Sequence, residues 1–155
     1  MRNPFLTVDT LIYHDNIDGR DVCKESVCFV LIKRKNEPYK DFWALPGGFV
    51  EYGETVESAA SREAKEETGL EIDLKGIIGV YSDPKRDPRG HTVSIAFLAR
   101  KAYGDLVADT DANDARYFGI DEIRDIDLAF DHRQIIEEGI SMFNRNEEGF
   151  YRNLE

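Results

Sequence analysis

The segment between Thr55 and Gly69 constrains the fold of this chain most strongly. Three alanines within it favour a helix, Thr55 or Glu54 can cap the N-terminus, and Gly69 can end the helix in a left-handed conformation. Residues typical of strands lie before and after this segment. A helix between strands must cover one face of a sheet, which predicts a mixed α/β domain.

Other elements follow from the alternation of apolar residues and from the turn residues. Strands are expected at 5–13, 26–35, 70–82, 91–102 and 115–120, two short extended pieces within 43–54, a helical turn at 121–126 and a helix at 132–145. The 155 residues contain no internal repeat or linker composition, so residues 1–155 are expected to form one domain.

Three glutamates prolong the apolar stripe of the central helix. At about 100° per residue, Glu63, Glu66 and Glu67 fall on the same side as Ala59 and Ala60. Carboxylates turned toward a packed face need compensation, because a buried unpaired charge is costly. Clusters of oxygen ligands suit Mg²⁺ or Mn²⁺. The spacing fits either a metal site or an exposed helix edge whose glutamates pair with nearby cationic side chains.

Arg62 lies beside this stripe and can reach back to Glu54, which precedes the helix. Such a pair would fix the preceding loop against the helix. Its expected role is to hold geometry rather than to take part in chemistry.

The stretch from Gly48 to Leu70 resembles the Nudix box. It reads GFVEYGETVESAASREAKEETGL, which is a Gly, five residues, a Glu, seven residues, and then Arg-Glu-apolar-x-Glu-Glu-x-Gly-apolar. Every specified position is filled. The resemblance implies a Nudix-type α/β/α sandwich with a mixed β-sheet. It also implies hydrolysis of a nucleoside diphosphate linked to another group, with Mg²⁺ or Mn²⁺ as the cofactor.

The resemblance also implies roles for particular residues. The metal ligands would be the backbone carbonyl of Gly47 and the carboxylates of Glu63, Glu66 and Glu67. Glu54 and Arg62 would be the structural pair of the catalytic site.

The general base differs between Nudix proteins, so more than one candidate stays open. Glu63 is the candidate within the box. Asp111 and Asp114, ahead of the strand expected at 115–120, are the distal candidates. The alternative for either aspartate is an ordinary loop acid or a cap.

Two further segments narrow the range of expected substrates. Residues 81–99 and 128–136 resemble the matching parts of small archaeal and bacterial ADP-ribose pyrophosphatases. They are less specific than the box, because other Nudix hydrolases and ADP-ribose-sensing regulators share them. The resemblance therefore favours hydrolysis of ADP-ribose to AMP and ribose 5-phosphate. Oxidised nucleotide triphosphates or dinucleoside polyphosphates are the alternative substrates. A non-catalytic sensor is less expected, because the box is intact and the chain has no room for a DNA-binding domain.

The loop at 83–90 provides the candidate contacts to substrate. Arg86 or Arg89 is expected to bind phosphate or ribose, with Asp83 beside them. Tyr81, Phe42 or Trp43 could stack on adenine. The alternatives are arginines that pair with acids of their own loop and a tyrosine that belongs to the core.

Charge and cysteine content limit the remaining possibilities. The 20 Lys and Arg against 31 Asp and Glu give a net charge of −11, which argues against nucleic acid and membrane partners. Cys23 and Cys28 are expected to be reduced, because residues five apart on a strand point to opposite faces. No segment resembles a signal peptide or a membrane span, so a cytoplasmic protein is expected. The resemblance makes a homodimer possible.

Overall fold

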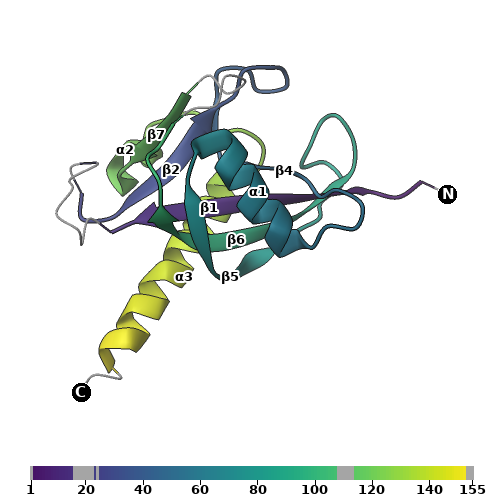
Figure 1. Cartoon of the computed structure of the whole chain (residues 1–155). Coiled ribbons are helices and arrows are strands. Elements are labelled where there is room, and N and C mark those ends of the chain that lie inside the picture. The colour runs from purple at the N-terminus through teal and green to yellow at the C-terminus, as the bar shows by residue number, and fades with distance from the viewer. Residues whose placement is uncertain (1, 16–22, 24, 108–113, 153–155) are drawn as a thin grey trace.

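A seven-stranded sheet forms the centre of the structure, a computed structural model that describes residues 2–15, 23, 25–107 and 114–152 (Figure 1). The strands are β1 (Phe5–His14), β2 (Cys28–Lys33), β3 (Trp43–Ala44), β4 (Gly47–Phe49), β5 (Glu71–Tyr81), β6 (Thr92–Tyr103) and β7 (Asp114–Phe118). The helices are α1 (Val56–Thr68), α2 (Ile120–Arg124) and α3 (His132–Arg152).

The sheet is mixed, as the sequence predicts. Its main path runs β3-β2-β1-β6-β5, with β4 paired to β1 and β7 paired to β2. The long pair β1–β6 is parallel, from Phe5 opposite Thr92 to Tyr13 opposite Arg100. The other pairs are antiparallel. β1 therefore lies at the centre, where both of its faces are covered.

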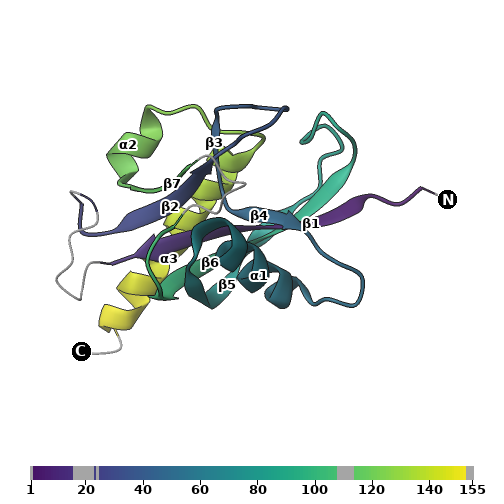
Figure 2. The ribbon, with the colours of Figure 1, turned by 45° about the horizontal axis from the view of Figure 1, so that its top comes forward.

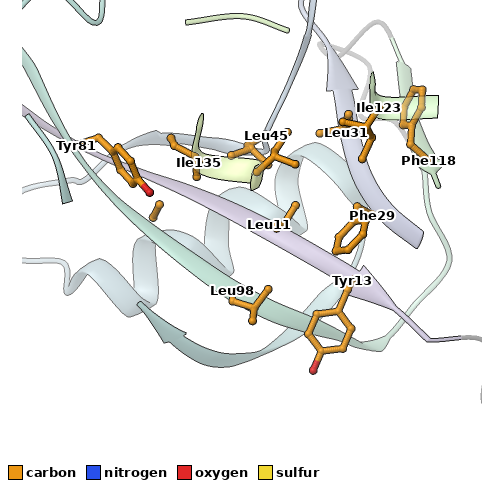
Figure 3. Close-up of a cluster of buried hydrophobic side chains, with 12 residues drawn as sticks. Leu11, Tyr13, Phe29, Leu31, Leu45, Tyr81, Leu98, Phe118, Ile123 and Ile135 are labelled. Atoms are coloured by element: carbon orange, nitrogen blue, oxygen red, sulfur yellow. The ribbon is translucent and has the colours of Figure 1, made fainter. Parts of the chain in front are cut away.

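Helices cover both faces of this sheet. Figures 1 and 2 show α1 on one face and α3 on the other, with the C-terminal half of α3 extending past the strands. Alternate side chains of β1 point to the two opposite faces of the sheet. Val8 packs with the alanines of α1, whereas Leu11 and Tyr13 belong to the larger cluster that includes residues of α3 (Figure 3). The expected α/β/α sandwich is confirmed.

Helix α1 begins and ends where the sequence predicts. The Thr55 hydroxyl accepts a hydrogen bond from the Ser58 backbone N–H at 3.1 Å, and Gly69 ends the helix with a φ of 77°. Its three alanines are fully buried. Because these side chains are small, the helix axis lies close to the sheet and brings the glutamates of the next turns to the strand ends.

Helix α3 is longer than predicted. The apolar pattern indicates a helix at 132–145, whereas the helix continues to Arg152. The added residues contain one glycine and no proline, so nothing in them stops the helix.

The expectation for the cysteines is wrong. Cys23 and Cys28 form a disulfide, with their Cα atoms 6.3 Å apart. Cys23 lies in irregular chain ahead of β2 rather than on the strand. The rule of alternating faces therefore does not apply to this pair.

No helix in the described part of the chain is both long and apolar enough to cross a bilayer. This agrees with the sequence, in which no long apolar run occurs.

Candidate active site

Arg62 ties helix α1 to the loop that precedes it. Its Nε and Nη2 donate to the two carboxylate oxygens of Glu54 at 2.7 and 2.9 Å, and Nη2 also donates to the Phe49 carbonyl at 3.1 Å. The hydrogen bond from Arg62 lowers the pKa of Glu54 to about 2. The structure thus brings together the expected pair, which holds the end of β4 against α1.

The three stripe glutamates lie in different environments along α1. Glu63 is 15% exposed and accepts a hydrogen bond from Arg62 at 2.8 Å. Glu66 is 55% exposed and lies 3.4 Å from the same guanidinium. Glu67 is half-buried, like Glu63, and accepts the Gly47 backbone N–H at 3.4 Å. The helix therefore presents Glu63 and Glu67 to the glycines of β4 and leaves Glu66 exposed.

The two glycines of β4 allow this close approach. A Cβ at Gly48 would lie 2.5 Å from a carboxylate oxygen of Glu63. A Cβ at Gly47 would lie 2.6 Å from the Asp9 carboxylate and would also clash with the Val8 carbonyl. Only residues without a side chain fit between the acids of α1 and those of β1.

Glu67 carries a strongly shifted pKa. Burial is the largest cause, and the charge and hydrogen bond of the neighbouring Glu63 add to it. Together they raise the pKa of Glu67 to about 9. The N–H of Gly47 opposes the shift without cancelling it. Carboxyl groups are therefore crowded at this point, and Glu67 favours its protonated form.

The donor set fits a hard divalent cation. It consists of carboxylate oxygens beside a backbone carbonyl, which are the ligands that Mg²⁺ and Mn²⁺ prefer. Within the described ranges, no three acidic, His or Cys side chains converge on one point as they stand. Arg62 holds both Glu63 and Glu66, so these two carboxylates must turn from it to join Glu67.

A pocket of about 240 Å³ opens beside Glu67. Its walls come from strands β1, β2, β3, β4 and β6, from α1, from the β5–β6 loop and from the start of α3. The lining residues are Thr7, Asp9, Ile32, Arg34, Ala44, Leu45, Gly47, Gly48, Phe49, Glu67, Arg86, Asp87, Arg89, Thr92, Phe130 and His132. Its charged lining residues are the acids Asp9, Glu67 and Asp87 and the arginines Arg34, Arg86 and Arg89.

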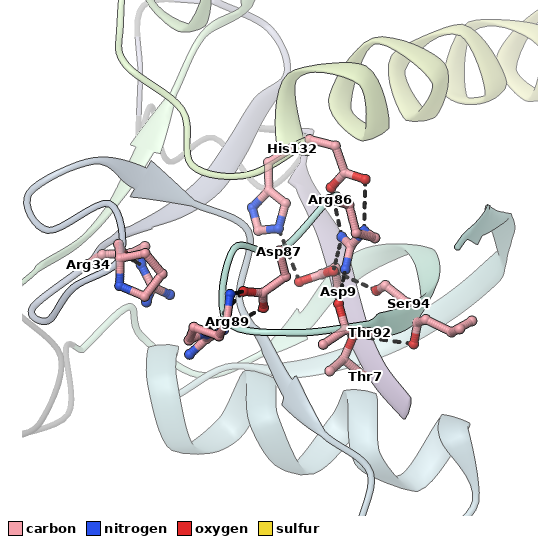
Figure 4. A network of polar contacts seen from close by, with 12 residues as sticks. Thr7, Asp9, Arg34, Arg86, Asp87, Arg89, Thr92, Ser94 and His132 are labelled. Carbon is pink, nitrogen blue, oxygen red and sulfur yellow. Dashed lines mark hydrogen bonds and ion pairs between the residues drawn. The ribbon is translucent and has the colours of Figure 1, made fainter. Parts of the chain in front are cut away.

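Arg86 is buried rather than displayed on the surface loop where the sequence places it. Its guanidinium is 5% exposed and binds both carboxylate oxygens of Asp131 at 2.7 and 2.8 Å (Figure 4). It also donates to Thr92 and lies 3.7 Å from Asp9. Burial would lower the pKa of Arg86, but the bonds to Asp131 outweigh it and raise the pKa. The alternative, in which Arg86 pairs with an acid of its own loop, is therefore wrong.

Arg89, unlike Arg86, pairs with an acid of its own loop. It pairs with Asp87 at 2.8 Å, while half of its side chain stays exposed. Its guanidinium carbon lies 5.5 Å from the centre of the Phe130 ring, and that of Arg34 lies 4.9 Å from the same ring. Burial, and then the charge of Arg89, lower the pKa of Arg34. Positive charge thus gathers at this side of the pocket.

Comparison with known proteins decides the family. A model of the NUDIX domain matches residues 11–139. This chain belongs to the Nudix family. Proteins of the family typically depend on a divalent metal.

Three relatives of this Nudix chain are informative. An ADP-ribose pyrophosphatase of Methanocaldococcus jannaschii is 48% identical over 88% of this chain and 73% of its own length. An ADPR responsive transcriptional repressor, NtrR of Acinetobacter baylyi, is 30% identical over 92% of this chain and 55% of its own. A bifunctional NMN adenylyltransferase/ADP ribose pyrophosphatase from Francisella tularensis, solved with AMP and a Mn ion, shares 28% identity and a TM-score of 0.77. That match covers 92% of this chain and 42% of the Francisella protein.

Of the expected site residues, Gly47, Glu67, Arg86 and Arg89 line the pocket. The others in the described part of the chain, Glu54, Arg62, Glu63, Glu66, Tyr81 and Asp83, are not among its lining residues. Tyr81 is in the core cluster, where burial and its hydrogen bond to Glu138 raise its pKa. Asp83 is exposed and accepts the Lys85 backbone N–H. Asp111 lies outside the described residues, and Asp114 begins β7 with a side chain that is not described.

Sequence reasoning missed three polar residues of this Nudix site: Asp9, Arg34 and His132. Asp9 is 8% exposed and accepts the Ser94 hydroxyl at 2.6 Å. Burial would raise its pKa, but the interaction with His132, the hydrogen bond from Ser94 and the charge of Arg86 outweigh it and lower the pKa. The signal in the sequence was a single aspartate within the apolar strand FLTVDTLIY, where a charge needs a partner.

Proposed function

We propose that this protein hydrolyses the pyrophosphate of ADP-ribose, releasing AMP and ribose 5-phosphate. The observation that carries the proposal is one pocket that is lined by Glu67 of the Nudix box together with Arg34, Arg86 and Arg89. A pyrophosphate needs compensation of its own charge on one side and a site for the attacking water on the other. The 48% identity to an archaeal ADP-ribose pyrophosphatase supports this choice of substrate.

We further propose that Mg²⁺ or Mn²⁺ is held by Glu63, Glu66, Glu67 and the carbonyl of Gly47. A bound divalent cation neutralises phosphate oxygens and lowers the pKa of a coordinated water. The shifted pKa of Glu67 supports the assignment, because crowded carboxylates gain most from a cation.

The protein's own groups then have separate tasks. Arg62 keeps the helix and the β4 loop in register through Glu54. Arg89, half exposed beside Phe130, is placed to donate to a phosphate oxygen from the opposite wall. Glu63 is the candidate to accept the proton of the attacking water, and Asp111 and Asp114 stay as distal candidates.

Metal binding is expected to release a proton and to strengthen as the pH rises. Without a cation, Glu67 is protonated at pH 7 because its pKa lies near 9. The folded pKa is above the ordinary value of about 4.5, so ionising this group costs stability between those two values. Added Mg²⁺ removes that cost. The rise in melting temperature caused by Mg²⁺, relative to EDTA, should therefore be larger at pH 8 than at pH 6.

The control is Glu67→Gln, which has no proton to release at this position. Its response to Mg²⁺ should be weak and should not change between pH 6 and pH 8. A wild-type response that is equal at both pH values would contradict a protonated Glu67.

A substrate panel tests the proposed specificity. With Mg²⁺, kcat/KM for ADP-ribose should exceed that for 8-oxo-dGTP and for a dinucleoside polyphosphate. A higher value on a triphosphate would make this chain another kind of Nudix hydrolase. The match to an ADPR responsive repressor favours a second candidate, an ADP-ribose sensor. Calorimetric binding of ADP-ribose without turnover, in the presence of Mg²⁺, would identify it.

A further inference from the structure

His132 joins three elements at the floor of the pocket. It is the first residue of α3 and is 3% exposed. Its Nδ1 accepts the backbone N–H of Leu45 at 3.0 Å, and its Nε2 lies 3.4 Å from the carboxylate of Asp9 (Figure 4). It thus links the C-terminal helix, the segment between β3 and β4, and the central strand.

The bond to Leu45 sets the tautomer of this ring. A backbone N–H can only donate, so Nδ1 must carry a lone pair and the ring proton must be on Nε2. That proton faces Asp9, whose other oxygen accepts the Ser94 hydroxyl at 2.6 Å. The Asp9 carboxylate therefore orients the ring, and the ring orients Leu45.

The segment that receives this bond carries the carbonyl proposed as a metal ligand. Leu45 precedes Pro46 and Gly47, and the Pro46 carbonyl accepts the Thr10 backbone N–H at 2.9 Å. Gly47 is the register partner of Asp9. Proline has no N–H to contribute. Within the segment from Leu45 to Gly47, the Leu45 N–H is therefore the donor that binds a residue of α3.

Backbone hydrogen bonds between β3 and the segment before α3 place His132 beside Leu45. The Trp43 backbone bonds to the Asp127 carbonyl and to the Ala129 N–H, each at 2.9 Å. The segment before α3 thus runs beside β3, and Phe130 turns the chain into the helix with a φ of 52°. The position of α3 is coupled through His132 to that of Gly47.

We propose that His132, oriented by Asp9, is a positioning residue for the Gly47 carbonyl and so sets the affinity of the site for its divalent cation. The inference rests on the proposed metal ligands. Groups that orient ligands in this way typically change metal affinity by about 10- to 100-fold when they are replaced.

Two substitutions of His132 distinguish the role of Nδ1 from that of Nε2. In His132→Asn, the side-chain oxygen takes the place of Nδ1 and can still accept the Leu45 N–H. In His132→Gln, the amide lies at the level of Nε2, near Asp9, and the acceptor for Leu45 is lost. His91→Asn is the matched control, because His91 is exposed and bonds to the Ser82 carbonyl away from the pocket lining.

The measurement is Mn²⁺ binding by electron paramagnetic resonance, without substrate. Wild type, His91→Asn and His132→Asn should bind within about threefold of one another, and His132→Gln about tenfold or more weaker. Equal affinity of all four proteins, or equal loss in both His132 variants, overturns the inference and leaves the proposed function standing. A wild type that binds no Mn²⁺ overturns the proposed metal site itself.

A second measurement uses the wild-type protein alone, in case a variant fails to fold. ¹⁵N chemical shifts of the His132 ring should report the proton on Nε2. A proton on Nδ1 would remove the bond to Leu45 and with it the inference.

Discussion

Replacing Glu67 with Gln is expected to lower kcat/KM for ADP-ribose by about a thousandfold or more. The amide keeps the shape of the side chain but cannot supply a carboxylate ligand. Because Glu67 is protonated at neutral pH without a cation, Gln imitates that state, and the melting temperature in EDTA should change little. Steady-state kinetics with Mg²⁺ and thermal unfolding in EDTA make the two measurements.

The matched control is Glu57→Gln. Glu57 lies on the same helix but is exposed and points away from the stripe. Its replacement should leave kcat/KM unchanged. Full activity of the Glu67→Gln protein would contradict the metal assignment.

Replacing Arg86 with Met is expected to lower the free energy of unfolding by about 3 kcal/mol. The guanidinium is 5% exposed, and its loss leaves Asp131 without its bidentate partner and Asp9 without a nearby cation. A buried carboxylate that loses its partner keeps its desolvation cost. Urea unfolding measures the change.

Arg89→Met is the comparison, since that side chain is half exposed and pairs with Asp87 at the pocket mouth. Its loss should cost less than about 1 kcal/mol. The double variant Arg86→Met with Asp131→Leu should recover much of the lost stability, because Asp131 no longer leaves an unpaired charge and Asp9 keeps its contacts with Ser94 and His132. Equal destabilisation by the two arginine substitutions would contradict the buried role of Arg86.

The helix and its acidic stripe were readable from the sequence because both depend on local spacing. Thr55 and Gly69 mark the ends of α1 by their own chemistry. The side on which Glu63 and Glu67 lie follows from the period of the helix. The pair Glu54–Arg62 also spans few residues, and the structure forms it.

The opposite wall of the pocket could not be read in the same way, because it depends on contacts between distant residues. Asp9 meets Ser94 through the parallel pairing of β1 with β6, and Arg86 meets Asp131 across 45 positions. A loop that contains two prolines and two arginines predicts an exposed basic patch. Burial of Arg86 depends on where α3 begins, and the spacing of loop residues does not encode that.

The cysteines show the limit of the strand rule. Alternation of faces holds only for residues within the strand, and Cys23 lies before β2 begins. A disulfide across such a junction depends on the path of irregular chain, which residue periodicity does not describe.

The products formed from ADP-ribose show directly whether this protein cleaves the pyrophosphate. The protein is incubated with ADP-ribose and Mg²⁺, and the products are separated by chromatography and identified by mass spectrometry. Equal amounts of AMP and ribose 5-phosphate are expected, and the Glu67→Gln protein should form them about a thousandfold more slowly. Intact ADP-ribose after incubation with the metal-loaded wild-type protein would contradict the proposed hydrolysis.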